Sequence, residues 1–255
     1  SSSSRQYTTR PSGMPSSAQK RHRNLAPGPI LRGDQAPRRI DSQARSRNLI
    51  LLFVPRIATF NLENLDDSTD ARPRLEERLP VLRPALLRLE ADVLCLQEVN
   101  ARAEPGRKRR SLFALEKLLE GTPYASFDRA TSLGVTGRRL ADHHNLAIPS
   151  RWPIQAGRSL RHNLVEPLDV TLPGQGGGPS EVYKVEWDRP LLHVSLELPG
   201  ERALEVLNLH LRAPLAAPVR GGKRPGGAWS GTDAWARGFY LAALKRDGQA
   251  LESRL

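Results

Sequence analysis

Beginning at Arg56, short apolar runs alternate with amphipathic segments, and this alternation narrows the choice of fold more than any other pattern in the chain. Such a pattern is typical of a layered domain in which helices cover sheets. Strands are expected at Ile57–Asn61, Asp92–Gln97, Tyr124–Asp128, Leu146–Ile148, Leu191–Leu198 and Leu204–Leu211. Helices are expected at Arg72–Glu90, Ser111–Glu120 and Trp235–Leu255, where leucines or other apolar residues recur at helical spacing.

Glycine and proline refine this prediction. Pro80 and Pro84 lie inside the first helix and should kink or break it. Pro199-Gly200 predicts a hairpin between the last two strands. Two glycine-rich segments, Gly174–Pro179 and Arg220–Gly227, are expected to be mobile loops, although the second is basic and could contact phosphate.

The amino-terminal segment differs in composition from the rest of the chain. Residues 1–48 are rich in Ser, Arg, Pro and Gln and have few residues that could form a core, so residues 1–55 are predicted to be a disordered basic extension. The first 56 residues hold eleven Lys/Arg and two acids, a net +9 of the total +12, which leaves +3 for the remainder. The extension is either an arm that binds nucleic acid or a solvated, even spuriously translated, segment.

Several features bear on the compartment and the partners. No run of about 18 to 20 apolar residues is present, so no membrane span is expected. No typical secretory signal is found, and the single cysteine, Cys95, lies in an apolar run where a buried and inert thiol is usual. We expect a cytoplasmic protein, with secretion left open, and no obligate protein partner is evident.

Three apolar strands each lead to a residue capable of chemistry: Asn61, Glu98 and His210. Glu98, directly after a buried strand, is a candidate ligand of Mg²⁺ or Mn²⁺, or else a solvated strand-end acid. Asn61 could hold a metal or a nucleophilic water, or could form a turn. His210 could donate a proton to a leaving oxygen, or could be a hydrogen-bonded core histidine.

Four segments together resemble the endonuclease/exonuclease/phosphatase superfamily, whose fold is that of DNase I. They are RIATFNLENLDD (Arg56–Asp67), ADVLCLQEVN (Ala91–Asn100), NLAIPSRWPI (Asn145–Ile154) and NLHL (Asn208–Leu211), followed by a helix that contains RDGQ (Arg246–Gln249). Each motif is moderately specific, and their order along residues 56–255 is that of the family. The resemblance implies an α/β sandwich of two mixed or antiparallel sheets flanked by helices.

The resemblance also implies roles for particular residues. Glu98 would bind the metal, Asn61 would assist the metal site or the nucleophilic water, and His210 would contact phosphate and protonate the leaving group. The substrate-binding candidates that accompany them are Asn208, His143, His144 and Asn145. The cofactor implied is Mg²⁺ or Mn²⁺, and the implied partner is a phosphate-ester substrate, with nucleic acid among the candidates.

The chain departs from the family pattern at its end. The family continues with Gly-Asp-x-Asn and Ser-Asp-His elements, which this sequence does not contain before Leu255. The resemblance therefore implies a domain without its carboxy-terminal part, and we expect a fragment without turnover, with an exposed strand edge and poor solubility.

Two functions from different classes follow. The first is a metal-dependent phosphoesterase, with a nuclease slightly favoured because the basic run Arg107–Arg110 would suit a nucleic-acid backbone. The second is a non-catalytic protein that binds anionic polymers on the same scaffold. Hydrolysis that requires Mg²⁺ and stops with EDTA distinguishes the first from the second.

Overall fold

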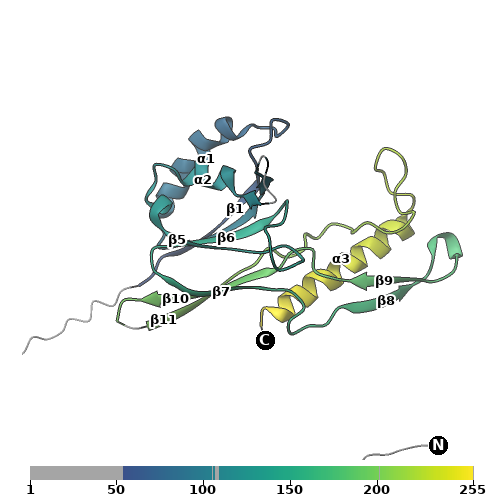
Figure 1. Ribbon diagram of the computed structural model, residues 1–255. Helices are drawn as coiled ribbons and strands as arrows, with labels where there is room; N and C mark the ends of the chain where they lie inside the picture. The colour runs from purple at the N-terminus through teal and green to yellow at the C-terminus, as the bar shows by residue number, and fades with distance from the viewer. Residues whose placement is uncertain (1–53, 105, 107–108, 201, 255) are drawn as a thin grey trace, which may run out of the picture. The chain divides into compact units, whose positions relative to one another are not determined.

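The computed structural model describes residues 54–104, 106, 109–200 and 202–254. Most of the predicted extension at residues 1–55, and the first two residues of the basic run Arg107–Arg110, lie outside the described residues. The described chain forms the predicted α/β sandwich of two sheets, with helices on the outer face of one of them (Figure 1).

The first sheet has four strands and mixed pairing. Its order is β1-β2-β6-β5, with β1 parallel to β2 and the other neighbours antiparallel. The strands are β1 (Ile57–Leu65), β2 (Val93–Val99), β5 (Asp128–Thr131) and β6 (Asn145–Ser150). Because β1 and β2 are parallel, their carboxyl ends lie at the same edge, where the predicted residues Asn61 and Glu98 are found.

The second sheet is antiparallel, in the order β11-β10-β7. Its strands are β7 (Ile154–Leu160), β10 (Leu191–Leu198) and β11 (Arg202–Asn208), and β10 and β11 form the predicted hairpin. The core between the sheets is made by alternate apolar residues of both, among them Val93, Cys95, Leu146, Ile148, Leu192, Val194 and Leu196. Cys95 is buried and free, as predicted, and burial raises its pKa to about 11.

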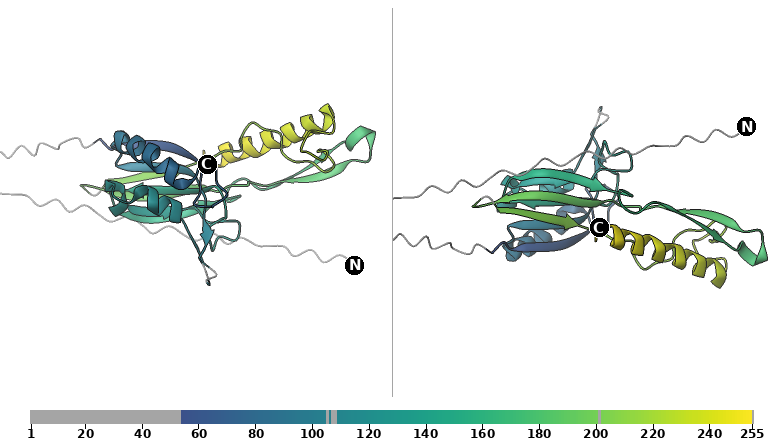
Figure 2. Two further views of the ribbon diagram at one scale, coloured as in Figure 1. Left: turned by 90° about the horizontal axis from the view of Figure 1, so that it is seen from above. Right: turned by 90° about the horizontal axis from the view of Figure 1, so that it is seen from below.

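Helices α1 (Leu75–Leu89) and α2 (Phe113–Leu119) cover the other face of the first sheet (Figures 1 and 2). Leu86, Leu115 and Leu118 are fully buried in the cluster that the helices form with β1 and β2. Tyr124 joins this layer, since its hydroxyl donates to Leu86 O and accepts from the Ala91 N–H.

Pro80 and Pro84 were predicted to kink or break the first helix. The break is wrong, because α1 runs through both, and the kink stays a prediction. Each proline lacks the N–H that would bond four residues back, which leaves the carbonyls of Glu76 and Pro80 without that donor. Glu76, Pro80 and Pro84 are spaced four apart and are all exposed, so water can satisfy those carbonyls.

Two further predictions are corrected at element ends. The expected strand Tyr124–Asp128 is instead a 3₁₀ turn at Pro123–Ser126, after which β5 begins at Asp128. Proline is favoured in the first turn of a helix, which explains the turn here. The expected strand to Leu211 ends at Asn208, so His210 lies just beyond β11.

A third apolar cluster joins helix α3 (Thr232–Glu252) to the hairpin of β8 (Leu168–Leu172) and β9 (Glu181–Val185). At the end of α3 the buried Glu252 carboxylate accepts from the backbone N–H groups of His162, Asn163 and Leu164 and from the Trp187 indole.

A short hairpin of β3 (Arg102–Ala103) and β4 (Arg110–Ser111) follows β2. None of the helices within the described residues is both long and apolar enough to cross a bilayer.

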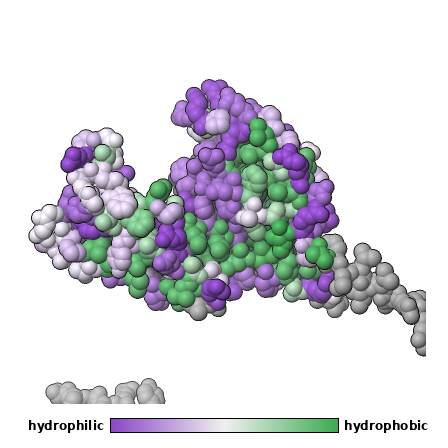
Figure 3. Space-filling view, turned by 180° about the vertical axis from the view of Figure 1, so that it is seen from behind, coloured by the Kyte–Doolittle hydropathy of each residue, from purple (hydrophilic) through white to green (hydrophobic). Residues whose placement is uncertain are grey.

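Within the described residues, β1 is one edge strand of the first sheet and β11 is one edge strand of the second. Ile57 pairs in register with Val93 of the inter-sheet core, yet 47% of Ile57 is exposed. Seen from behind, hydrophobic residues form a broad patch between hydrophilic ones (Figure 3). Exposed edges and apolar patches promote association, so low solubility stays a prediction.

Candidate functional site

The predicted residues Asn61, Glu98 and His210 meet at one edge of the sandwich. Asn61 Nδ2 donates to Glu98 Oε1 over 3.1 Å, and the Asn64 N–H donates to Glu98 Oε2 over 2.9 Å. His210 Nε2 lies 3.4 Å from Glu98 Oε1. Two strand ends of the first sheet and the segment after β11 therefore bring an amide, a carboxylate and an imidazole together.

The backbone at this edge adopts unusual conformations. Six described residues other than glycine have positive φ, and four of them are here: Glu63 (48°), Asn64 (52°), Glu98 (60°) and His144 (58°). The pairing of β2 shifts register on both sides of Glu98, with β1 and with β6. Left-handed residues and bulges cost energy and re-aim side chains, and they concentrate at functional sites. This strain turns Glu98 away from the strand alternation and toward Asn61.

Asn61 forms the turn that was one of its two interpretations from the sequence, and it also contacts Glu98; its role toward a metal or a nucleophilic water stays a prediction. Its Oδ1 accepts from the Glu63 N–H over 2.8 Å, which forms a local turn, while its Nδ2 holds Glu98. The turn fixes the orientation of the amide before any ligand arrives.

Arg189 also belongs to this site, although the sequence did not single it out. One terminal nitrogen, Nη1, lies 2.8 Å from Nδ1 and 2.9 Å from Nε2 of His210. Gln249 of α3 fixes the backbone here, because its side chain donates to Arg189 O and accepts from the Arg212 N–H. The sequence signal for Arg189 was its position directly before Pro190, at the start of β10. Proline disfavours the helical conformation in the residue before it, which indicates an extended backbone at Arg189.

The site separates charged and neutral groups. Burial alone would raise the pKa of Glu98, but the hydrogen bonds from Asn61 and Asn64, and then the histidines, outweigh burial and lower the pKa. Burial, and then the charge of Arg189, lowers the pKa of His210 to about 4 in spite of Glu98. At neutral pH the site therefore holds an ionised carboxylate, a guanidinium and a neutral imidazole.

His144 lies next to these groups. Its ring centroid is 6.4 Å from that of His210, and its Nδ1 is buried with no hydrogen-bond partner in the described part of the chain. Burial, and then Arg189, lowers the pKa of His144. His143 is exposed, with its ring 6.2 Å from that of His144. A buried ring nitrogen without a partner is a natural contact for a ligand.

The other two predicted substrate-binding residues, Asn145 and Asn208, are buried and bonded to protein atoms. Asn145 donates to Val99 O and Ala141 O and accepts from the Ala141 N–H. Asn208 donates to Leu96 O and Ala147 O and accepts from Gln97. Their contact with substrate stays a prediction, and what they do here is fix the segments that carry His144 and His210.

Asn208 joins the two sheets, so its removal should be costly. We expect Asn208→Ala to lower the free energy of unfolding by about 2 to 3 kcal/mol, because it removes three buried hydrogen bonds, those with Gln97, Leu96 O and Ala147 O. Urea denaturation followed by circular dichroism measures the change. Gln155→Ala, which removes an exposed amide, should change the free energy by less than about 0.5 kcal/mol. Equal effects of the two substitutions would refute this account of Asn208.

The donor set fits a hydrated Mg²⁺ with few protein ligands. Within the described residues no group of three or more His, Cys, Asp or Glu side chains is placed to hold a metal. Glu98 is ionised and its side chain is 15% exposed. Its Oε1 accepts from Asn61 and its Oε2 from the Asn64 N–H, so further lone pairs are available. Mg²⁺ keeps several waters and binds through one or two carboxylates together with phosphate oxygens. Glu98, held in place by the Asn61 side-chain amide and the Asn64 N–H, meets this minimum.

Comparison with known proteins returns matches among solved structures. No protein-family model matches the chain, and no curated protein does. Six solved chains match, including an endonuclease/exonuclease/phosphatase family protein from Leptotrichia buccalis at 16% identity and TM-score 0.40, covering 63% of this chain and 56% of that one. A protein of the same description from Beutenbergia cavernae matches at 25% identity and TM-score 0.33, covering 63% and 39%.

A third match is the mannosyl-6-phosphatase of Bacteroides thetaiotaomicron, at 18% identity and TM-score 0.35, covering 74% of this chain and 57% of that one. The chain thus spans between 39% and 57% of the length of these solved structures.

Proposed function

We propose that this chain carries the site of a metal-dependent phosphoesterase, one that hydrolyses phosphodiester or phosphomonoester bonds. The observation that supports the proposal most is the contact of an ionised Glu98, a fixed Asn61 amide, His210 and Arg189 at one strained strand edge. An anionic ester needs both a cation and a hydrogen-bond donor against its oxygens, and this set offers a place for the first and supplies the second.

Arg189 is proposed to bind the phosphate oxygens of the ester. A guanidinium offers paired donors that match a phosphate, and Arg189 is held from both sides by Gln249 and His210. His144, with its unpartnered Nδ1, is a second contact. His143 is proposed only at the rim, because it is exposed.

Glu98 is the proposed metal ligand, with Asn61 at its side. Bound Mg²⁺ would supply Lewis-acid polarisation of a phosphoryl oxygen. Asn61 keeps Glu98 ionised and oriented through its Nδ2–H, and the Asn64 N–H does the same at the second oxygen.

His210 is proposed first as a hydrogen-bonding group to phosphate. Protonation of the leaving oxygen requires the imidazolium, which the site without substrate disfavours because burial and Arg189 lower the pKa to about 4. A phosphate anion beside the ring would favour the protonated form. The role of proton donor, proposed from the sequence, thus depends on substrate being bound.

This chain is proposed to bind phosphate esters with little or no turnover. Within the described residues no group of three or more His, Cys, Asp or Glu side chains is placed to hold a metal, and we propose that a base that orients the attacking water is lacking there as well. Efficient hydrolysis needs a positioned nucleophile as well as a bound ester. Binding of phosphate esters is therefore the more direct test.

The test compares phenyl phosphate with phenyl sulfate by isothermal titration calorimetry, in Mg²⁺ and in EDTA. We expect phenyl phosphate to bind about tenfold more tightly with Mg²⁺, since the dianion needs the cation to offset Glu98, and phenyl sulfate to gain much less. Phenol release is followed in the same samples and should be slow. Equal affinities for phenyl phosphate in Mg²⁺ and in EDTA would contradict a metal-dependent site and leave the non-catalytic binder.

A further inference from the structure

Another pocket, of about 420 Å³, is lined by four arginines, Arg109, Arg110, Arg138 and Arg139. Arg110 is in the short strand β4, and Arg138 and Arg139 lie in the loop between β5 and β6. Thr131, Leu133 and Leu140 complete the walls. Four guanidinium groups around one concavity repel one another unless acids or a bound anion compensate them.

Acids compensate only two of the four. Arg110 pairs with Asp142 over 2.6 Å, and Arg109, which is largely exposed, lies 3.7 Å from Glu104. Neither Arg138 nor Arg139 forms an ion pair with an acid of the described residues, and both are exposed. The pocket therefore keeps two uncompensated positive charges.

A tight turn presents these two arginines. The Gly134 N–H donates to Arg139 O over 2.7 Å, and the Gly137 N–H donates to Gly134 O over 2.9 Å. Gly137 has a φ of 65°, which favours glycine directly before Arg138. Two adjacent guanidinium groups on an ordered turn match the geometry of phosphate oxygens.

The pocket and the site share one segment of chain. Leu140 lines the pocket, and His144, four residues later, has its ring 6.4 Å from that of His210. The Ala101 N–H donates to Asp142 O, and the Asn145 side chain holds both backbone polar groups of Ala141. An anion in the pocket would therefore contact the chain segment that also carries His144 of the site.

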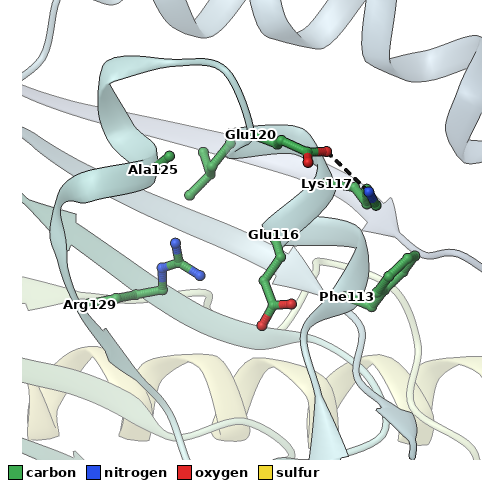
Figure 4. A pocket seen from close by; sticks show the side chains of 7 residues that line it. Phe113, Glu116, Lys117, Glu120, Ala125 and Arg129 are labelled. Carbon is green, nitrogen blue, oxygen red and sulfur yellow. Dashed lines mark hydrogen bonds and ion pairs between the residues drawn. The ribbon is translucent and has the colours of Figure 1, made fainter.

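A pocket on helix α2 also contains an arginine but has no excess of positive charge among its lining residues (Figure 4). It has a volume of about 390 Å³ and combines Arg129 and Lys117 with Glu116 and Glu120. Lys117 and Glu120 form an ion pair over 3.1 Å. Its lining charges balance, so nothing there selects an anion.

We propose that the pocket of Arg109, Arg110, Arg138 and Arg139 binds a phosphate group of the substrate other than the one held by Arg189 and His210. This inference rests on the proposed function and deepens it, because it assigns the substrate to polyanions with two or more phosphates. A nucleic-acid strand is the source we favour, since its phosphates repeat along one backbone. A small polyphosphate carries the same chemistry.

The test measures binding of a fluorescein-labelled, short single-stranded DNA by fluorescence anisotropy over a range of salt concentrations, without divalent metal. We expect Arg138→Ala with Arg139→Ala to weaken binding about tenfold and to reduce the slope of log K against log salt by about 1 to 2, as for the loss of two phosphate contacts. The control, Arg88→Ala with Arg202→Ala, removes the same charge from exposed positions away from the pocket and should change binding less than about twofold. All variants keep the basic amino-terminal segment.

Inositol hexakisphosphate, titrated as an unlabelled ligand, distinguishes the sources. Loss of affinity for the DNA in the Arg138/Arg139 variant alone supports a strand, and loss for inositol hexakisphosphate alone supports a small polyphosphate at the same pocket. Unchanged affinity for both, or an equal loss in the control variant, overturns the proposal. Inorganic phosphate binding to the same variants reports on Arg189 and His210 separately, so the proposed function can fail or stand independently.

Discussion

Replacing Arg189 with alanine is expected to weaken binding of inorganic phosphate about 10- to 100-fold. A hydrogen bond to a charged group contributes about 1.5 to 3 kcal/mol, and each 1.4 kcal/mol is about a factor of ten in affinity. Arg189 is the cation nearest the site, in direct contact with His210. Calorimetric titration of phosphate into the variant and the parent measures the loss.

Arg212→Ala is the matched control for this prediction. Arg212 is close enough to affect the pKa of Arg189, but its guanidinium is directed at Asp188 over 3.3 Å. We expect it to retain phosphate affinity within about threefold, the range of a screened, partly exposed charge. Arg189→Lys, which keeps the charge without the paired donors, should fall between the parent and Arg189→Ala. If Arg212→Ala loses as much affinity as Arg189→Ala, net charge and not the Arg189 contact explains binding.

Glu98→Gln is expected to weaken binding of Mn²⁺ by at least about tenfold. Loss of groups that only support a metal ligand already costs about 10- to 100-fold in affinity, and Glu98 is the one carboxylate that the Asn61 and Asn64 donors hold in place. Glutamine has the same shape as glutamate. We therefore expect the variant to keep the unfolding temperature of the parent, which a thermal unfolding experiment checks. Electron paramagnetic resonance of free Mn²⁺ during a titration gives the affinity.

Glu63→Gln provides the comparison for this second prediction. Glu63 is exposed, has positive φ and lies in the same strand, but no hydrogen bond joins it to Glu98 among the described residues. A change of less than about twofold is expected, because an exposed charge in water attracts the cation weakly. Equal loss in the two variants would mean that Mn²⁺ associates with the acidic edge in general and not with Glu98.

The sequence predicted the layers of this fold because their signal is local. Strand β10 was predicted with its observed bounds, and β2, α1 and α3 within a few residues, since buried apolar runs and leucine spacing are read directly from the chain. Strands β7, β8 and β9 were missed because their residues are mostly exposed or half-buried, and the apolar alternation of β8 covers only five residues. Whether a strand is exposed depends on which other segments pack against it, and the strand's own sequence does not specify those segments.

The site was predictable in part for the same reason. Asn61, Glu98 and His210 each follow an apolar run, so a position toward the carboxyl end of a strand could be inferred. That β1 continues past Asn61 to Leu65, after a shift of register, could not. Arg189 could not be placed, because its contact with His210 depends on the path from β9 to β10 and on Gln249 of α3. Asn208 and Asn145 were predicted to contact substrate. In the structure the Asn208 side chain donates to Leu96 O of the first sheet, and the Asn145 side chain donates to Val99 O.

The central claim is that Asn61, Glu98, Arg189 and His210 surround one place for a cation and a phosphate. Paramagnetic broadening by substoichiometric Mn²⁺ in nitrogen-15 spectra, recorded with inorganic phosphate present, tests it most directly. The account predicts that the Asn61 side-chain amide and the backbone amides of Asn64 and Glu98 lose intensity first, together with Arg189. Broadening that begins elsewhere, for example around the His193–Glu205 pair on the second sheet, and spares these four signals would contradict it.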